Sequence, residues 1–308
     1  MTANRSSRNK TIAVSENEAR LLAPRVLTPA DLAGGLSFAD TLVNGDIMEV
    51  ADMLPDGFAD LVIADPPYNL SKKFGSAGFS AMPRERYEDY LRTWFHAVCS
   101  KLRSDGSLYL CGDWRSSSSL QRVMEEELTV MNRITWQREK GRGAKANWKN
   151  GMEDIWFGVK DPDHYWFDLE AVKLRRRVIA PYRENGVPKD WKDSPDGPYR
   201  LTCPSNFWDD ISIPFWSMPE NTEHPAQKPE KLMAKLILAS CPPGGVVFEP
   251  FAGSGSACVT AKKLGRHYVG VEIDRDYCLV AAKRLRLADS DKRIQGYDGI
   301  NFRERNSF

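Results

Sequence analysis

Short apolar runs alternate along the chain with longer segments in which apolar residues recur every three or four positions. The short runs predict buried strands, and the longer segments predict amphipathic helices. The expected strands are residues 40–44, 60–64, 107–111, 132–136, 155–159, 246–249 and 268–272. The expected helices are residues 84–101, 117–127, 229–240, 256–264 and 275–287. This alternation predicts an α/β fold with a seven-stranded, mostly parallel sheet flanked by helices on both faces.

One long segment, residues 137–223, interrupts the alternation with prolines, tryptophans and two basic clusters. We therefore expect a single domain in two halves, residues 26–136 and 224–288, with an insertion between them. The two ends of the chain are polar. They predict a flexible N-terminal arm over residues 1–25 and a C-terminal tail over residues 289–308.

The basic clusters of the insertion are candidates for binding nucleic acid, because cationic side chains near aromatic rings suit phosphates and stacked bases. The aromatic neighbours are Trp148, Tyr182 and Trp191. An inserted subdomain with its own aromatic core and a solvated charged face is the alternative. The candidate residues are Arg138, Lys140, Arg142, Lys145 and Lys149 in the first cluster and Arg175, Arg176 and Arg177 in the second.

Composition narrows the class of protein only a little. The 308 residues are 42% hydrophobic and 28% charged with a formal net charge of +1, so overall charge does not decide for or against nucleic acid. The six cysteines form no CxxC pair, which argues against a zinc site and fits a reducing cytoplasm. No apolar run reaches the roughly 20 residues of a membrane helix, and the first residues do not resemble a secretory signal.

A carboxylate, two prolines and an aromatic ring follow one expected strand directly, in Asp65-Pro66-Pro67-Tyr68. Proline fixes φ and lacks an N–H donor, so neither a helix nor a strand continues through this segment. Ligands of open α/β sheets bind at the carboxyl ends of strands. The segment is therefore a candidate site, although a proline-rich turn with a capping aspartate has the same pattern.

A second motif combines a strand, a glycine turn, a helix and another strand. Glu249 ends the first strand, Phe251, Gly253 and Gly255 belong to the turn, and Glu272 ends the second strand. Glycines let a ligand approach the backbone beside a helix N-terminus, and an acid at the next strand end accepts hydrogen bonds from ribose hydroxyls. The motif predicts an adenosine-bearing cofactor.

S-adenosylmethionine fits this motif better than a dinucleotide does. The dinucleotide fingerprint requires a third glycine where this chain has Cys258. Two acids, Glu249 and Glu272, flank the turn and suit a ligand that carries positive charge and no pyrophosphate.

Asp65-Pro66-Pro67-Tyr68 followed by Phe251-Ala252-Gly253-Ser254-Gly255 resembles the amino-methyltransferases of DNA, of the β class by the order of the two motifs. The resemblance covers roughly residues 42–288. It implies the class I S-adenosylmethionine-dependent methyltransferase fold in a circularly permuted form, with the insertion recognising the target. It also implies double-stranded DNA as partner, no metal, and a dimer or higher oligomer.

The resemblance assigns two further cofactor residues. Asp46 lies in the segment that reads the adenine of the cofactor, and an aspartate that closes a turn is the alternative. Lys228, in His224-Pro225-Ala226-Gln227-Lys228-Pro229, is a partner for the methionine carboxylate, or else it is solvated at a helix start. Ala226 stands where the family has threonine, so a hydroxyl contact is not expected there. His224 is expected to be structural.

The implied reaction is methyl transfer to the N6 amino group of adenine by direct in-line attack. Asp65 and the carbonyl of Pro66 accept the amine hydrogens, Pro67 stiffens the backbone, and Tyr68 stacks on a base flipped out of the duplex. An aspartate in the first motif position favours adenine, and methylation of cytosine N4 is the alternative. A DNA-binding regulator that has lost catalysis is a hypothesis of another class. The recognition sequence and the existence of a partner endonuclease cannot be read from the sequence.

Overall fold

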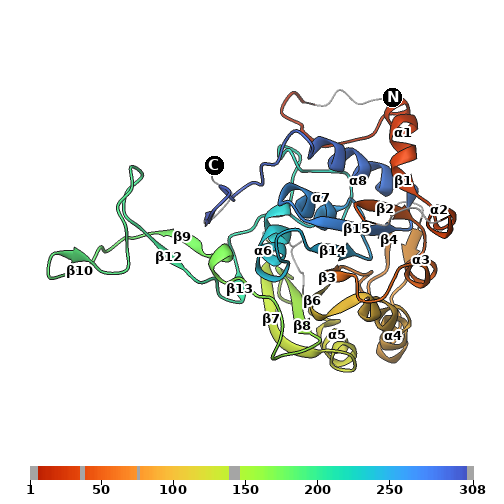
Figure 1. Ribbon diagram of the computed structural model, residues 1–308, viewed down its shortest axis with the longest axis horizontal. Coiled ribbons are helices and arrows are strands. Elements are labelled where there is room, and N and C mark those ends of the chain that lie inside the picture. The colour runs from red at the N-terminus through yellow and green to blue at the C-terminus, as the bar shows by residue number, and fades with distance from the viewer. Residues whose placement is uncertain (1–5, 35–38, 75–76, 139–145, 304–308) are drawn as a thin grey trace.

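A nine-stranded sheet forms the centre of the molecule, in the order β1-β2-β15-β14-β3-β6-β8-β7-β13 (Figure 1). The structure is a computed structural model, and it describes residues 6–34, 39–74, 77–138 and 146–303. The strands of this sheet are β1 (Val26–Leu27), β2 (Thr41–Asn44), β3 (Ala59–Ala64), β6 (Leu102–Gly112), β7 (Thr129–Gln137), β8 (Met152–Val159), β13 (Phe207–Trp208), β14 (Val246–Glu249) and β15 (His267–Glu272).

All seven predicted strands are present and form the inner part of this sheet, so the predicted fold class is confirmed. The two additional strands, β1 and β13, are the outermost ones. Each has only two residues, which is too short to leave a periodic pattern. Neighbouring strands are parallel except for β8, which runs antiparallel to β6 and β7.

Helices cover both faces of the sheet, and the five predicted helices are all confirmed. One face carries α3 (Ile47–Met53), α4 (Arg84–Lys101) and α5 (Ser117–Glu125), and the other carries α6 (Glu230–Ser240), α7 (Ser256–Lys263) and α8 (Arg275–Leu287) (Figure 1). Successive residues of β3 enter opposite cores, Val62 under α4 and Leu61 under α6. This alternation is the period-two geometry of a strand that is buried on both faces.

The prediction of a flexible N-terminal arm is wrong for residues 16–25. They form the helix α1 (Glu16–Leu22) and a 3-10 turn over Ala23–Arg25. Ser15 and Glu18 make a capping box, Leu22 is fully buried, and Glu18 lies 2.7 Å from the Nζ of Lys283 on α8. A further short helix, α2 (Pro29–Ala33), precedes β2. The N-terminal segment is therefore part of the folded domain.

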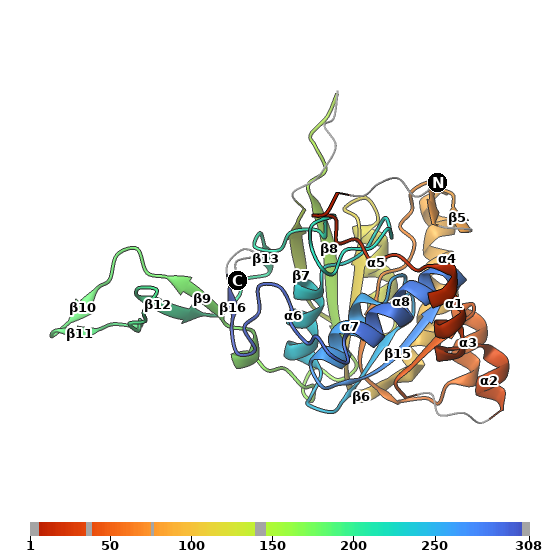
Figure 2. The same ribbon diagram turned by 90° about the horizontal axis from the view of Figure 1, so that it is seen from above.

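The predicted insertion is not continuous, because β8 belongs to the central sheet. Two separate segments remain. One is residues 138–151 between β7 and β8, of which the structure describes residues 138 and 146–151, and the other is residues 160–206. Part of the second segment is an arm that extends far from the body in both views (Figures 1 and 2). The strands of the arm are β9 (Leu174–Arg177), β10 (Arg183–Glu184), β11 (Val187–Pro188) and β12 (Tyr199–Thr202).

The C-terminal segment is also more than a polar tail. Its strand β16 (Phe302–Arg303) pairs in parallel with β9, with Arg303 opposite Arg175. Phe302 is fully buried, and Ile294 joins it in a small core against α6. These contacts attach the C-terminal segment to the base of the arm.

The described part of the chain contains neither a membrane-spanning helix nor a metal site. No helix within the four described ranges has the length and apolar character needed to cross a membrane. In the same part of the chain, no group of His, Cys, Asp and Glu side chains is arranged to hold a metal ion.

Candidate active site

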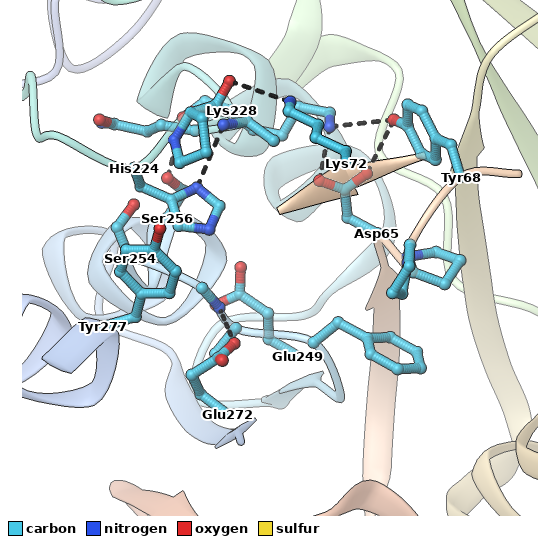
Figure 3. Close-up of a pocket in the computed structure, with 18 of the residues that line it drawn as sticks. Asp65, Tyr68, Lys72, His224, Lys228, Glu249, Ser254, Ser256, Glu272 and Tyr277 are labelled. Carbon is cyan, nitrogen blue, oxygen red and sulfur yellow. Dashed lines mark hydrogen bonds and ion pairs between the residues drawn. The ribbon is translucent and has the colours of Figure 1, made fainter. Parts of the chain in front are cut away.

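Three neighbouring strands end beside one cavity. The register pairs Val62 of β3 with Phe248 of β14, and Glu249 of β14 with Gly270 of β15, so their carboxyl ends lie at the same edge. Figure 3 shows Asp65 and Tyr68 on one side of this cavity and Glu272 and Tyr277 on the other. The structure thus brings the two sequence motifs, which are far apart in the chain, to a common site.

The Asp65 segment is held rigidly at the end of β3. The hydroxyl of Tyr68 donates to Asp65 Oδ1 at 2.8 Å, and the hydroxyl of Tyr87 on α4 donates to the carbonyl of Pro67 at 3.1 Å. Asn69 exchanges two hydrogen bonds of 2.8 Å with the backbone of Met82. The prolines and these contacts together fix the carboxylate of Asp65 at the wall of the cavity.

A buried cluster of charges surrounds Asp65. Lys228 Nζ lies 2.5 Å from Asp65 Oδ2, 3.1 Å from the hydroxyl of Tyr68 and 3.5 Å from Glu153 Oε2, and Arg138 is ion-paired with Glu153. Burial opposes the charge on Lys228, but the carboxylates of Asp65 and Glu153 outweigh it and raise its pKa. Burial and the same two carboxylates raise the pKa of Tyr68, so its hydroxyl stays protonated.

The two glycines of the second motif are required by packing as well as by their backbone conformation. Gly253 has φ +51°, and a Cβ on it would lie 2.9 Å from the imidazole Nε2 of His224. Gly255 has φ +72°, and its Cβ would lie 2.8 Å from that of Ala281 on α8. Of the two, only Gly253 lines the cavity. Close approach to a ligand therefore explains Gly253 alone, and Gly255 lets α7 and α8 pack closely.

Two acids, the half-buried Glu272 and the buried Glu249, hold the backbone around the glycine turn. Glu272 accepts from the N–H of Gly253 at 2.7 Å and of Asp274 at 2.8 Å. Glu249 accepts from the N–H of Ala257 at 3.0 Å and of Cys258 at 2.9 Å, at the start of α7. Burial raises the pKa of Glu272, and it raises that of Glu249 to about 7.

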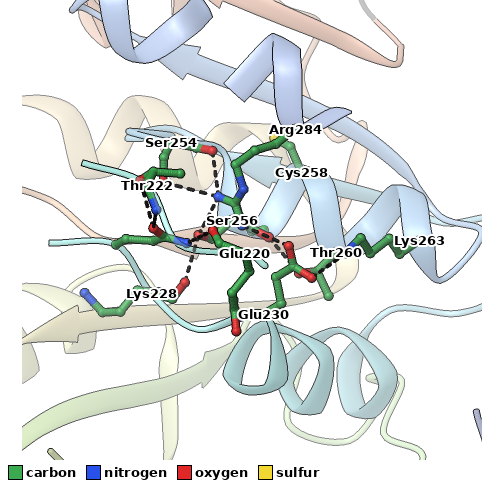
Figure 4. A network of polar contacts seen from close by, with 12 residues as sticks. Glu220, Thr222, Lys228, Glu230, Ser254, Ser256, Cys258, Thr260, Lys263 and Arg284 are labelled. Atoms are coloured by element: carbon green, nitrogen blue, oxygen red, sulfur yellow. Dashed lines mark hydrogen bonds and ion pairs between the residues drawn. The ribbon is translucent and has the colours of Figure 1, made fainter. Parts of the chain in front are cut away.

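A polar network lies behind the turn (Figure 4). The guanidinium of Arg284 donates to the carbonyl of Ser254 at 2.8 Å and to the hydroxyl of Ser256 at 3.1 Å, and it pairs with Glu230 at 3.0 Å. The hydroxyl of Ser256 donates to the carbonyl of Lys228 at 2.8 Å. Arg284 thus connects the glycine turn to the segment that carries Lys228.

The other predicted cofactor residues differ in position. Phe251 lines the cavity and packs edge-on against Trp94 at 4.8 Å. Asp46 lies outside the lining, where it caps α3 by accepting from the N–H of Met48 at 2.8 Å. Lys228 faces Asp65, so its predicted contact with a cofactor carboxylate, like the adenine contact of Asp46, stays a prediction. His224 is half-buried, and desolvation lowers its pKa to about 4, which fits a structural role.

The predicted DNA-binding residues fall into three places. Arg138 lines the cavity instead of facing outward, and Lys149 is exposed on the loop beyond it. Arg176 and Arg177 are exposed on β9, whereas Arg175 is half-buried on the same strand. Trp191 is buried and donates to the carbonyl of Tyr182 at 2.7 Å, so the structure contradicts its suggested stacking on a base. Lys140, Arg142 and Lys145 lie outside the described residues.

Glu153 and Tyr277 are among the cavity residues that the sequence reasoning missed. Glu153 is the second residue of β8, and its position depends on that strand running antiparallel to its neighbours, which no sequence pattern revealed. Tyr277 lies in the first turn of α8, five residues after Glu272, and its ring contacts His224 edge-on with centroids 4.4 Å apart. The short distance along the chain from Glu272 was a usable signal for Tyr277.

Comparison with known proteins agrees with this geometry. The model of the DNA methylase family matches residues 59–283. The chain belongs to this family. DNA adenine methyltransferase YhdJ of Escherichia coli (strain K12) is 31% identical over 257 residues, which are 81% of this chain and 84% of that protein. The protein is therefore a DNA methyltransferase that uses S-adenosylmethionine.

Solved structures of other methyltransferases have the same fold as this one. The M1.HpyAVI complex with S-adenosylmethionine has a TM-score of 0.53 and 21% identity, covering 79% of this chain and 97% of that one. The PvuII DNA methyltransferase, which is cytosine-N4-specific, has a TM-score of 0.59 and 18% identity, covering 79% and 85%. At these identities the likeness concerns the fold alone.

The residues around the cavity of this methyltransferase fit S-adenosylmethionine. Gly253 lines the cavity at a point where any side chain would collide with His224. The absence of a side chain there leaves the backbone accessible to a ligand. Glu272 uses one lone pair of each oxygen on backbone N–H groups, which leaves acceptor capacity for a ribose diol. Phe251 offers an aromatic face in the same cavity.

Proposed function

We propose that this methyltransferase transfers a methyl group to the N6 amino group of adenine in duplex DNA. The observation that carries the proposal is the shared cavity, in which Asp65-Pro66-Pro67-Tyr68 faces the glycine turn and Glu272. When bound, S-adenosylmethionine supplies a methyl group on positively charged sulfur, which the amine takes directly.

The proposed task of Asp65 is to make a poor nucleophile reactive. The lone pair of the adenine amine is delocalised into the ring, and hydrogen bonds accepted from its N–H groups favour a pyramidal nitrogen. Asp65 Oδ1 and Oδ2 keep free lone pairs beside Tyr68 and Lys228, and the carbonyl of Pro66 is the second acceptor. The S–CH3 bond breaks as the N–CH3 bond forms, so the positive charge passes from sulfur to nitrogen, and the methylated amine then releases one proton to Asp65 or solvent. Because that proton is acidic once the methyl group is attached, positioning of the amine dominates over acid–base chemistry.

Tyr68 is the proposed stacking surface for the flipped base. A base inside the duplex cannot reach the cavity, so it must leave the stack at a cost of a few kcal/mol. The hydrogen bonds from Tyr68 to Asp65 and from Lys228 to Tyr68 hold this ring in place. A fixed ring loses little conformational entropy when the base stacks on it.

Three of the cofactor residues are proposed to contact the cofactor directly, and two others are proposed to act indirectly. Glu272 accepts from the ribose hydroxyls, Phe251 contacts the adenine, and Gly253 allows close approach. Glu249 acts indirectly, because its carboxylate accepts hydrogen bonds from two N–H groups at the N-terminus of α7. Gly255 acts indirectly as well, through the packing of α7 on α8.

DNA is proposed to lie against the arm and beside Lys149, which is exposed between β7 and β8. On one face of the arm, Arg175, Arg177 and Arg303 line a cleft together with Tyr199. Arg175 is fixed there by a 2.8 Å hydrogen bond to Ser194 and by the ring of Tyr199 at 4.2 Å. Three guanidinium groups around one cleft suit a backbone phosphate. The target-recognition role expected of residues 137–223 thus divides between two segments.

Two observations favour adenine over cytosine N4. The first motif residue is Asp65, and the relative of 31% identity is named an adenine methyltransferase. The test is to incubate the protein with unmethylated DNA and labelled S-adenosylmethionine, digest the DNA and separate the nucleosides. We expect label in N6-methyladenine. Label in N4-methylcytosine would establish the alternative, and no transfer with intact DNA binding would indicate a regulator without catalysis.

A further inference from the structure

Glu153 is a buried carboxylate beside the proposed catalytic residue, and no role has been assigned to it so far. It lies at the start of β8, the strand that runs against its neighbours, so it reaches the same edge of the sheet as the ends of β3 and β14. Only 4% of its surface is exposed. A carboxylate at this depth needs compensating partners to stay ionised.

Two of its three partners, Lys228 and Tyr68, also bind Asp65. Arg138, which directly follows β7, pairs with Oε1. On the other side, Oε2 lies 3.5 Å from the ammonium of Lys228 and 3.3 Å from the hydroxyl of Tyr68. The ammonium of Lys228 and the hydroxyl of Tyr68 therefore lie between the carboxylates of Glu153 and Asp65. Asp65 lies 2.5 Å from the ammonium and 2.8 Å from the hydroxyl.

We propose that Glu153 is a positioning residue that shares Lys228 and Tyr68 with Asp65 and so keeps Asp65 available to the substrate amine; this rests on the proposed function. The hydroxyl of Tyr68 has one hydrogen, and Glu153 competes for it with Asp65. Glu153 also attracts the ammonium of Lys228 from the opposite side. Without Glu153, both donors would turn fully to Asp65 and occupy the lone pairs that the amine requires.

The second consequence concerns the charge of Lys228. Burial disfavours its ammonium form, and two carboxylates offset that cost. Removing one carboxylate leaves the burial unchanged, so the ammonium must titrate at lower pH. A neutral Lys228 no longer holds Asp65 in place, so activity would be lost at a pH where the wild type is still active.

The test compares Glu153→Gln with wild type in single-turnover assays across pH. The amide keeps the size of the side chain but loses its charge. We expect the rate at neutral pH to fall at least about tenfold, with affinities for DNA and cofactor changed less than about threefold. The alkaline limb of the pH–rate profile should move to lower pH by about one unit or more. Glu153→Asp should recover part of the rate.

A matched control is Glu88→Gln on α4. Glu88 is also buried, at 7% exposure, and is paired with Arg84 at 3.0 Å, but it does not line the cavity. Its loss should lower the thermal stability and leave both rate and pH profile as in wild type. If Glu153→Gln behaves like this control, Glu153 is only structural and the inference is overturned.

A measurement without substrate separates this inference from the proposed function. The ¹³C chemical shift of Lys228 Cε, assigned by its loss in Lys228→Met, reports the ammonium in the free protein. It should titrate at lower pH in Glu153→Gln than in wild type. An unchanged titration overturns the inference whether or not the protein methylates adenine, and a wild type that methylates no adenine contradicts the proposed function alone.

Discussion

Replacing Glu272 by alanine is predicted to weaken cofactor binding. The two oxygens of Glu272 accept hydrogen bonds from the N–H groups of Gly253 and Asp274 at 2.7 and 2.8 Å, and Glu272 lines the cavity where the ribose is expected. A hydrogen bond to a charged group contributes about 1.5–3 kcal/mol. Loss of the carboxylate should therefore reduce the affinity for S-adenosylmethionine by about ten- to a hundredfold.

Isothermal titration calorimetry with S-adenosylmethionine measures this loss directly. Asp276→Ala is the control, because Asp276 is an exposed acid in the first turn of α8 and does not line the cavity. Burial raises the pKa of Glu272, so its carboxylate becomes protonated at a higher pH than an ordinary glutamate does. As the pH is lowered, the affinity of wild type for S-adenosylmethionine should therefore begin to fall at a pH above the ordinary range of a glutamate. Equal affinity in Glu272→Ala and wild type would refute the placement of the ribose.

Two further predictions concern the arm and the buried acid under α7. Replacing Arg176 and Arg177 by alanine should lower the slope of log affinity for DNA against log salt concentration by about one unit per lost phosphate contact. Arg293→Ala, the control, should leave this slope unchanged. An unchanged slope in the arm variant would remove these two arginines from the DNA interface. For Glu249, the folded pKa of about 7 lies above the ordinary 4.5, so the folded state holds the proton more tightly. The free energy of unfolding should then fall by about 3 kcal/mol as pH rises from about 4.5 through 7. In Glu249→Gln this fall should disappear from denaturant unfolding curves; a fall as large as in wild type would contradict the assignment.

The elements that could be predicted from the sequence are those with enough residues to show a period. The seven inner strands and five long helices met this condition, whereas β1 and β13, with two residues each, did not. The helix α1 was missed although Ser15 and Glu18 form a capping box, a signal that was readable in the sequence.

The sequence could place a residue at the cavity where that residue lies at the carboxyl end of a parallel strand. Asp65 and Glu272 both immediately follow or end such a strand, so the sheet alone brings them to one cavity. Glu153 and Arg138 depend on the antiparallel direction of β8, and charge patterning placed Arg138 on the DNA surface instead. The contact between Lys228 and Asp65 joins residues 163 positions apart, which no local pattern contains.

The central claim, that the carboxylate of Asp65 activates the amine, is tested most directly by the single-turnover rate of Asp65→Asn on a methylatable duplex. The amide keeps the size and can cap a turn as well as aspartate does. It loses the charge that Lys228 and the amine require. We expect S-adenosylmethionine and DNA to bind while the methyl-transfer rate falls by about 100-fold or more. A rate near that of wild type would show that Asp65 only closes a turn, and would contradict the account.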